Sequence, residues 1–308
     1  MSAPHRNHRD RIRRAGDIAR SSVKRYPREI LDSLRSRQHG HGLERAGSFI
    51  PEGFVAPLAA SWLGHATVLL HVGGKWILTD PVFSSRIGVR FGPLVVGVKR
   101  LEPAPVHPED LPVLDAILIS HAHFDHLDKP SLQSLVRPST VVVTASNTGR
   151  LIPRGFADVQ ELAWGRDIDL GGARIRAIQP QHWGARTAWD RHRGFNSYLI
   201  ESTGTRTLFA GDTAKTDAYN CLASEGGVDL GIFGIGAYDP WIEAHASPEQ
   251  VWAMHEASGG RYLLPIHHRT FKLSNEAADE PLERLRQAAS PDTSRVIGQD
   301  LGTLWIPG

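Results

Sequence analysis

Cysteine is nearly absent from this sequence, which has only Cys221 among 308 residues. A single cysteine cannot form an internal disulfide, and it excludes a cysteine-based zinc finger or a dithiol redox pair. We therefore expect a reducing compartment. We also expect Cys221 to be a small buried apolar residue.

Long apolar runs are absent too. No run approaches the roughly 18 residues of a membrane-spanning helix, and the N-terminus lacks the apolar stretch of a signal peptide. The sequence shows no repeat of about 20 to 50 residues and no low-complexity tract. Hydrophobic residues make up 41% and charged residues 22%, as in ordinary globular proteins. These features predict a soluble, cytoplasmic protein with one large domain.

Charge is unevenly distributed although the formal net charge is only +2. Residues 1–45 hold twelve Lys and Arg against five Asp and Glu, whereas the rest holds 23 against 28. We predict a basic N-terminal extension over residues 1–45 and a folded domain over residues 46–308. Apolar residues in the extension recur at the helical period, with Pro27 breaking the pattern into two helices. Such helices can contact the inner membrane surface peripherally, pack on the body or meet a partner subunit.

From Ser61 onward, short apolar segments end at Gly, Pro, Asp or His, which is typical of strands. The predicted strands are Trp62–Val72, Trp76–Thr79, Ala116–Ser120, Thr140–Thr144, Ala173–Ile178, Ser197–Glu201, Thr207–Ala210, Leu230–Ile235 and Tyr262–Ile266. The predicted helices are Pro130–Val136, Thr216–Ser224, Pro248–Ser258 and Pro281–Ala289. Strands outnumber helices, so we expect sheets packed face to face with helices outside.

The strongest chemical signal is the segment 121–126, His-Ala-His-Phe-Asp-His, which follows the apolar run 116–120. It places four metal-ligating side chains in six residues. Imidazole nitrogens and carboxylate oxygens suit zinc and other divalent ions. The pattern predicts a metal site.

Three more donors follow predicted strands, namely His182, Asp212 and His267. Side chains at strand ends along one sheet edge can converge from remote parts of the sequence. We expect His121, His123 and His182 on one ion, Asp125, His126 and His267 on a second, and Asp212 between them. Two Zn²⁺, or other divalent metals, would then share a hydroxide able to hydrolyse a substrate at neutral pH.

The order and spacing of these residues resemble the motif of the metallo-β-lactamase superfamily, which is H-x-H-x-D-H followed by a later His, an Asp and a final His. The resemblance is closest to the branch of N-acyl-phosphatidylethanolamine-hydrolysing phospholipase D and its bacterial relatives. The supporting segments are 62–67, 78–81, 118–126, 181–183, 209–213 and 236–238. The resemblance implies an α/β (α+β) protein with a four-layered αβ/βα sandwich and ions at one edge between the sheets.

The resemblance also implies supporting residues. Asp80 corresponds to an aspartate that hydrogen-bonds a ligand histidine in relatives, although an ordinary Asp-Pro turn explains it equally well. His65, in the predicted strand Trp62–Val72, is expected to support the site or to satisfy a buried hydrogen bond. The expected catalytic residues are Asp125, which is also a predicted metal donor, and His245. His245 could stabilise the transition-state oxygen or protonate the leaving group.

The sequence departs from the phospholipase pattern in two places. The stretch between Gly236-Ala237-Tyr238 and His245 is shorter, which puts lipid specificity in doubt. At the last donor, His267 aligns with the family, but His268 is an alternative that would change the strand register. His268 and Arg269 could otherwise bind substrate phosphate, or form a solvated surface pair, and Tyr238 is a further candidate substrate contact.

Three functions remain open from the sequence. The first is a binuclear zinc phosphodiesterase of the phospholipase D type, acting on a small-molecule or lipid phosphodiester. The basic extension and Trp183, Trp189 and Trp241 are compatible with a lipid substrate. The second is a lactonase or another acyl or amide hydrolase with the same ligands. The third is a catalytically silent scaffold or nucleic-acid binding module, which ranks last because the body lacks a dense basic surface. The sequence does not indicate the oligomeric state.

Overall fold

The computed structural model describes residues 50, 54–92, 94–187 and 189–308. The basic extension over residues 1–45 lies outside the described residues. Its two helices, its membrane contact and the domain boundary at residue 45 therefore stay predictions.

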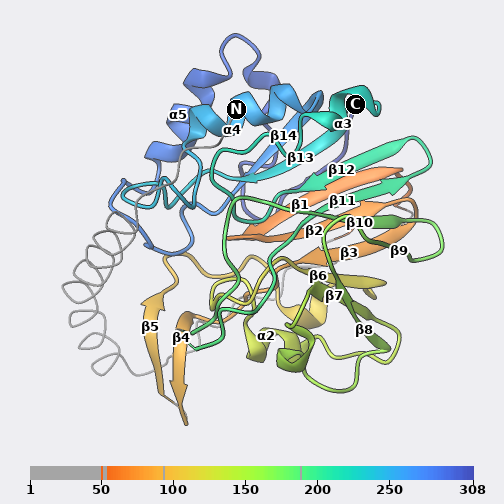
Figure 1. The fold of residues 1–308 in the computed structure, drawn as a ribbon, viewed down its shortest axis with the longest axis vertical. Helices are drawn as coiled ribbons and strands as arrows, with labels where there is room; N and C mark the ends of the chain where they lie inside the picture. The colour runs from red at the N-terminus through yellow and green to blue at the C-terminus, as the bar shows by residue number, and fades with distance from the viewer. Residues whose placement is uncertain (1–49, 51–53, 93, 188) are drawn as a thin grey trace, which may run out of the picture.

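Two sheets pack face to face in the body of the molecule (Figure 1). The seven-stranded sheet has the order β15-β1-β2-β3-β6-β7-β8, and the six-stranded sheet has the order β14-β13-β12-β11-β10-β9. The bounds of the first sheet are β1 Leu58–Gly64, β2 Thr67–Val72, β3 Lys75–Thr79, β6 Ala116–Ile119, β7 Val141–Ala145, β8 Asp158–Leu162 and β15 Leu304–Trp305. Those of the second are β9 Asp167–Asp169, β10 Arg174–Ile178, β11 Ser197–Ser202, β12 Thr205–Phe209, β13 Val228–Gly234 and β14 Gly260–Ile266.

Alternation along the strands creates the layers. In β6, Ala116 and Leu118 face the core between the two sheets, whereas Ile117 and Ile119 face outward to a second cluster that contains Leu132 of helix α2. The six-stranded sheet also buries its outer face, against a cluster that includes residues of α4 and α5. The order is thus helix, sheet, sheet, helix, and the predicted four-layered sandwich is confirmed.

The helices begin where the sequence supplies caps. Asp128 caps α2 by accepting from the backbone of Ser131, and Ser247 and Gln250 form a capping box at α4. Each of α2, α4 and α5 has a proline in its first turn, where no backbone donor is needed. The α-helices are α2 Lys129–Ser134, α3 Cys221–Ser224, α4 Pro248–Ala257 and α5 Glu280–Ala288, and the short 3-10 turns are Pro108–Asp110, Gly149–Leu151 and Thr293–Arg295. Within the described ranges, no helix has the length and apolar character to cross a membrane.

The predicted single strand Trp62–Val72 is wrong, because the chain turns back on itself in its middle. It forms the antiparallel pair β1 and β2, with Gly64 opposite Thr67. Gly64 has φ +106°, and a β-carbon there would lie 2.2 Å from the guanidinium of Arg100. His65 follows with φ +52°. His65 therefore lies in a tight turn rather than in a strand.

The predicted helix Thr216–Ser224 is also wrong over most of its length. Only α3 is helical, because the Thr216 hydroxyl accepts a hydrogen bond from the Ala218 backbone and favours a turn there. Cys221 begins α3 at the surface and is exposed. The expectation that Cys221 is buried is therefore wrong as well.

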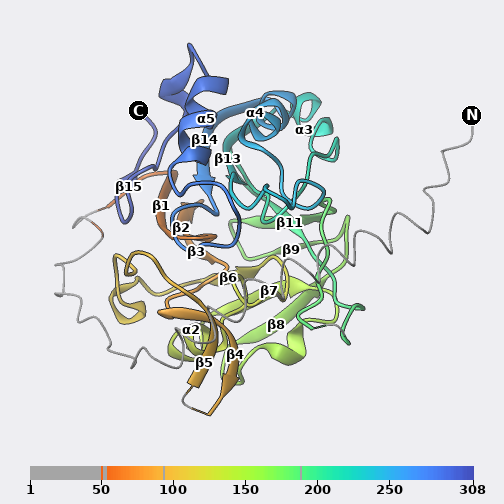
Figure 2. The ribbon, with the colours of Figure 1, turned by 90° about the vertical axis from the view of Figure 1, so that its left-hand side faces the viewer.

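The short strands β8, β9 and β15 and the hairpin of β4 (Arg86–Phe91) and β5 (Leu94–Lys99) were not predicted from the sequence. The hairpin pairs with neither large sheet and projects from the body (Figure 2). Gly88 lies opposite Gly97 in it, and Val89 and Phe91 are exposed. Glycine in the middle of both hairpin strands interrupts their apolar runs, and the other three strands are short, so their sequence signals are weak.

His255 of α4 is a buried histidine far from the sequence motifs, and it gives the fold a pH dependence. Its ring occupies space beside Gly260, where a β-carbon would lie 2.1 Å from the ring. Burial, assisted by the charge of Arg295, lowers its pKa from 6.5 to about 3. Between these values the unfolded chain binds more protons than the folded chain, so acidification destabilises the fold.

We therefore expect His255→Gln to flatten the decline of unfolding free energy with falling pH. Between pH 6 and pH 4, the slope should decrease by up to about 1.4 kcal/mol per pH unit relative to the wild type. Urea denaturation across this range measures the slope. His192→Gln, which removes an exposed histidine, is the control. Equal slopes in the wild type and His255→Gln would contradict the assignment.

Candidate metal centre

Several strands end at one edge of the sandwich and deliver the predicted donors there. Strands β12, β13 and β14 are parallel, as are β3, β6, β7 and β8, so within each group their carboxyl ends share an edge. His121 follows β6, Asp212 follows β12 and His267 follows β14 directly. Figure 2 shows the loops after β13 and β14 above the β4–β5 hairpin. The fold thus gathers side chains that are up to 146 residues apart in the sequence.

The first donor group consists of His121, His123, His182 and Asp212, whose ligand atoms all lie within 4.8 Å of one another. Nδ1 of His123 lies 2.8 Å from Nε2 of His121 and 3.4 Å from Nε2 of His182. Donors around a tetrahedral zinc ion at about 2.0–2.1 Å are about 3.3 Å apart. The spacing of the three imidazoles fits such an ion.

The second donor group consists of Asp125, His126 and His267 together with the same Asp212. Oδ2 of Asp125 lies 3.6 Å from Nε2 of His126 and 3.5 Å from Nε2 of His267. Oδ2 of Asp212 lies 3.1 Å and 3.3 Å from the same two nitrogens. These distances also suit a compact ion site.

Asp212 joins the two groups through a single oxygen. Its Oδ2 is also 3.9 Å from Nε2 of His121 and 3.7 Å from Nε2 of His182. Among the described residues, Asp212 Oδ1, His126 Nε2 and His267 Nε2 are buried atoms without a hydrogen bond of proper geometry. Buried polar atoms are normally paired, so this donor set fits divalent cations well.

The charges of the metal-free chain support the same conclusion. Burial alone would raise the pKa of Asp212, but His126 and His267 outweigh it and hold the pKa well below its usual range. Burial alone would lower the pKa of His267, whereas Asp212 and Asp125 raise it to about 9. Without metal, protons on His126 and His267 balance the carboxylates. A bound cation would replace these protons.

Asp80 and His65 hydrogen-bond predicted ligands. Oδ2 of Asp80 lies 2.6 Å from Nδ1 of His126, and Nε2 of His65 lies 3.0 Å from Oδ2 of Asp125. Such partners fix the orientation of a ligand. Ser120 was not predicted as a site residue, yet its hydroxyl contacts both Asp80 and Nδ1 of His121. Its place directly before the motif was the only signal for it.

The two adjacent histidines after β14 face different surroundings. His267 adopts φ +62° and turns its ring toward the donors, and Gly236 packs so closely that a β-carbon there would lie 2.2 Å from the His267 carbonyl oxygen. His268 instead stacks on Trp62, with ring centroids 4.6 Å apart, and is buried. The structure therefore places His267 at the donor groups and His268 away from them.

His245 lies beside the donors, with Nδ1 3.8 Å from Oδ2 of Asp212 and its ring 5.2 Å from those of His182 and His267. Burial lowers the pKa of His245 to about 4. Tyr238 does not join the cluster, because its hydroxyl donates to Glu280 of α5. Trp183 and Trp189 are 46% and 92% exposed, and Trp183 stacks on His182.

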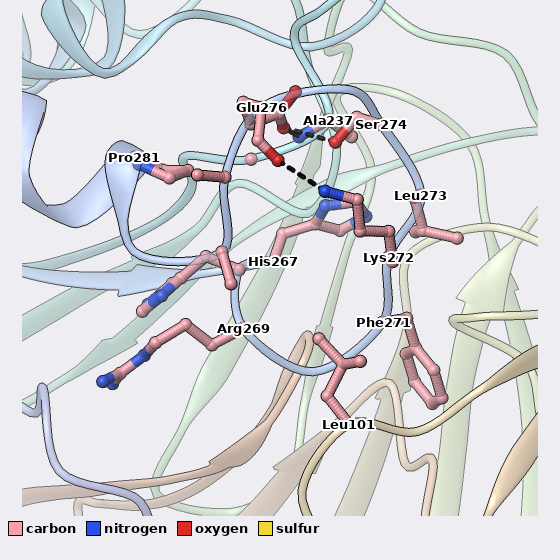
Figure 3. Close-up of a pocket in the computed structure, with 14 residues that line it drawn as sticks. Leu101, Ala237, His267, Arg269, Phe271, Lys272, Leu273, Ser274, Glu276 and Pro281 are labelled. Carbon is pink, nitrogen blue, oxygen red and sulfur yellow. Dashed lines mark hydrogen bonds between the residues drawn. The ribbon is translucent and has the colours of Figure 1, made fainter.

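A pocket behind His267 lies between the segments 236–237 and 267–281 (Figure 3). Glu276 joins these segments, since its carboxylate accepts from the backbone of Ala237 and its carbonyl accepts from Nζ of Lys272. Arg269 extends away from Lys272, its guanidinium 5.4 Å from the ring of Trp62. His267 thus lines this pocket as well as the donor cluster, whereas Arg269 does not reach into the donor cluster.

Comparison with known proteins identifies related sequences. A family model described as a beta-lactamase superfamily domain matches residues 75–268. An uncharacterized protein of Mycobacterium tuberculosis is 33% identical over 268 residues, which cover 82% of this chain and 71% of that protein. N-acyl-phosphatidylethanolamine-hydrolyzing phospholipase D 1 of Caenorhabditis elegans is 32% identical over 273 residues, which cover 80% of this chain and 75% of that protein.

Solved structures share the architecture at lower sequence identity. The crystal structure of an isothiocyanate hydrolase from Delia radicum gut bacteria has a TM-score of 0.63 to this chain at 17% identity. The match covers 80% of this chain and 98% of that one. At this identity the similarity concerns the fold alone.

Proposed function

This chain belongs to the metallo-β-lactamase superfamily and is a metal-dependent hydrolase, and from that premise we propose that it cleaves a phosphodiester with two zinc ions. The phosphodiester assignment depends mainly on the 32% identity to a phospholipase D over three quarters of that protein. The substrate is a small-molecule or lipid phosphodiester.

The two donor groups joined by Asp212 support a pair of ions. His121, His123 and His182 would hold one ion, Asp125, His126 and His267 the other, and Asp212 would touch both. Two such cations supply a strong nucleophile from water at neutral pH and withdraw charge from substrate oxygens. The chain needs no serine or cysteine nucleophile for this chemistry.

The remaining residues hold the donors in place and contact the substrate. Asp80 orients His126 through its 2.6 Å contact, and the Ala244 carbonyl lies 3.1 Å from Nδ1 of His182. His245 stands beside Asp212 and can donate a hydrogen bond to a substrate oxygen. Exposed Trp183, against His182 and His123, offers an apolar surface next to the reacting group.

Substrate assays of the zinc-loaded chain test the proposal. We expect turnover of bis-p-nitrophenyl phosphate and of N-acyl-phosphatidylethanolamine, and little turnover of simple lactones and amides. Equimolar EDTA-treated chain is the control, and its activity should return with added zinc. Turnover of lactones alone would overturn the phosphodiester assignment and favour the acyl hydrolase.

His245→Ala should impair the rate and leave metal binding intact. A positioned hydrogen-bonding or proton-transferring side chain contributes about 10²- to 10⁴-fold, so we expect kcat to fall within that range. Zinc content by elemental analysis should stay at the wild-type value, because the proposed ligands are untouched. Loss of an ion in His245→Ala would instead make His245 a ligand.

A further inference from the structure

Arg186 connects two loops of the metal centre. It lies in the segment between β10 and β11, four residues after His182. Its Nη1 donates to the carbonyl oxygens of Ala122 at 2.9 Å and Leu127 at 2.8 Å. The guanidinium also lies 4.0 Å from the ring centroid of Phe124. One side chain therefore contacts two residues of the six-residue motif, Ala122 and Phe124, and the residue that directly follows it, Leu127.

The two carbonyls lie on either side of residues 123–126, which carry three of the predicted donors, and His121 directly precedes Ala122. Ala122 and Leu127 are fully buried, and buried carbonyls need donors. Inside the loop, the His123 carbonyl accepts from the backbone of His126 and Leu127, which closes a turn. Arg186, from a different loop, links the two residues that flank this turn, Ala122 and Leu127, through their carbonyl oxygens. This holds the imidazoles of the motif at fixed positions.

The contact matters most for the first donor group. That group combines His121 and His123 from the motif with His182 from the loop of Arg186. The second donor group takes no residue from residues 179–196. A bond between the two loops therefore sets distances within the first group, including the 3.4 Å between His123 and His182.

We propose that Arg186 is a positioning residue. It fixes the motif loop relative to the loop of His182, so that the donors from both loops lie at the distances that the first ion needs. The inference rests on the proposed metal centre. Arginine suits the task because its planar fork can bond to carbonyls while its face stacks on an aromatic ring. Lysine keeps the charge and can donate, but it cannot reproduce the planar stack on Phe124.

Zinc affinities of variants test this role. We expect Arg186→Met to lower the affinity for one of the two zinc ions by about 10- to 100-fold, the usual effect of losing a group that orients a ligand. The affinity for the other ion should stay unchanged. Arg186→Lys should lie between this variant and the wild type. Arg191→Met, which removes an exposed arginine of the same loop, is the control.

Competition with a chromophoric chelator gives the two affinities, and the visible spectrum of the cobalt-loaded chain reports the ligand geometry of the weakened site. Thermal unfolding of the metal-free chain shows whether the variants fold. If Arg186→Met does not fold, the zinc affinities of Arg186→Lys test the inference. Wild-type affinities in a folded variant, or equal weakening of both ions, would overturn the inference while the proposed function stands. A wild-type chain that binds no zinc would overturn both.

Discussion

Asp212→Ala is expected to abolish turnover and to lower the zinc content from two ions per chain to one or fewer. Both donor groups depend on Asp212, because its Oδ2 lies within 3.9 Å of ring nitrogens from five histidines. Paired metal ions supply several kcal/mol of transition-state stabilisation, so the rate should fall by roughly a thousandfold or more.

The variant should also affect the metal-free chain. Asp212 is buried and balances the protonated His126 and His267, so its removal leaves buried positive charge unpaired. Asp212→Asn keeps the shape of the side chain and serves as a second variant. Asp110→Ala, at an exposed carboxylate, is the control. Elemental analysis and the phosphodiester assay give the readouts, and near-wild-type rates in both Asp212 variants would contradict the bridging role.

The position of the donors could be foreseen because it depends on sheet geometry that the sequence encodes. Apolar runs mark β6, β12 and β14, and the parallel arrangement brings their carboxyl ends to one edge. His121, Asp212 and His267 follow these ends, and local spacing adds His123, Asp125 and His126. That these side chains hold metal remains the proposal.

Contacts across the fold could not be foreseen. Arg186 shows no pattern with the motif, because its partners are backbone carbonyls about 60 residues away. The strand predicted over 62–72 runs through Gly64 and His65, yet these two residues form a left-handed turn that points His65 at Asp125. The hairpin β4–β5 was not predicted because Gly88 and Gly97 interrupt the apolar runs of its two strands.

The choice between His267 and His268 illustrates the same limit, since neighbouring residues cannot be told apart by spacing. The structure separates them through the backbone, because φ of +62° turns His267 toward Asp125 and Asp212. Replacement of each by asparagine gives a matched pair, and asparagine tolerates the left-handed conformation that His267 requires.

We expect His267→Asn to lose one zinc ion and roughly a thousandfold or more in rate, because the second donor group loses a nitrogen that contacts both carboxylates. His268→Asn should keep both ions. It should lose about 1–3 kcal/mol of unfolding free energy, since a buried ring stacked on Trp62 is removed. Elemental analysis separates the two variants and urea denaturation measures the stability. Loss of metal in His268→Asn with metal retained in His267→Asn would contradict the assignment and make His268 the last ligand.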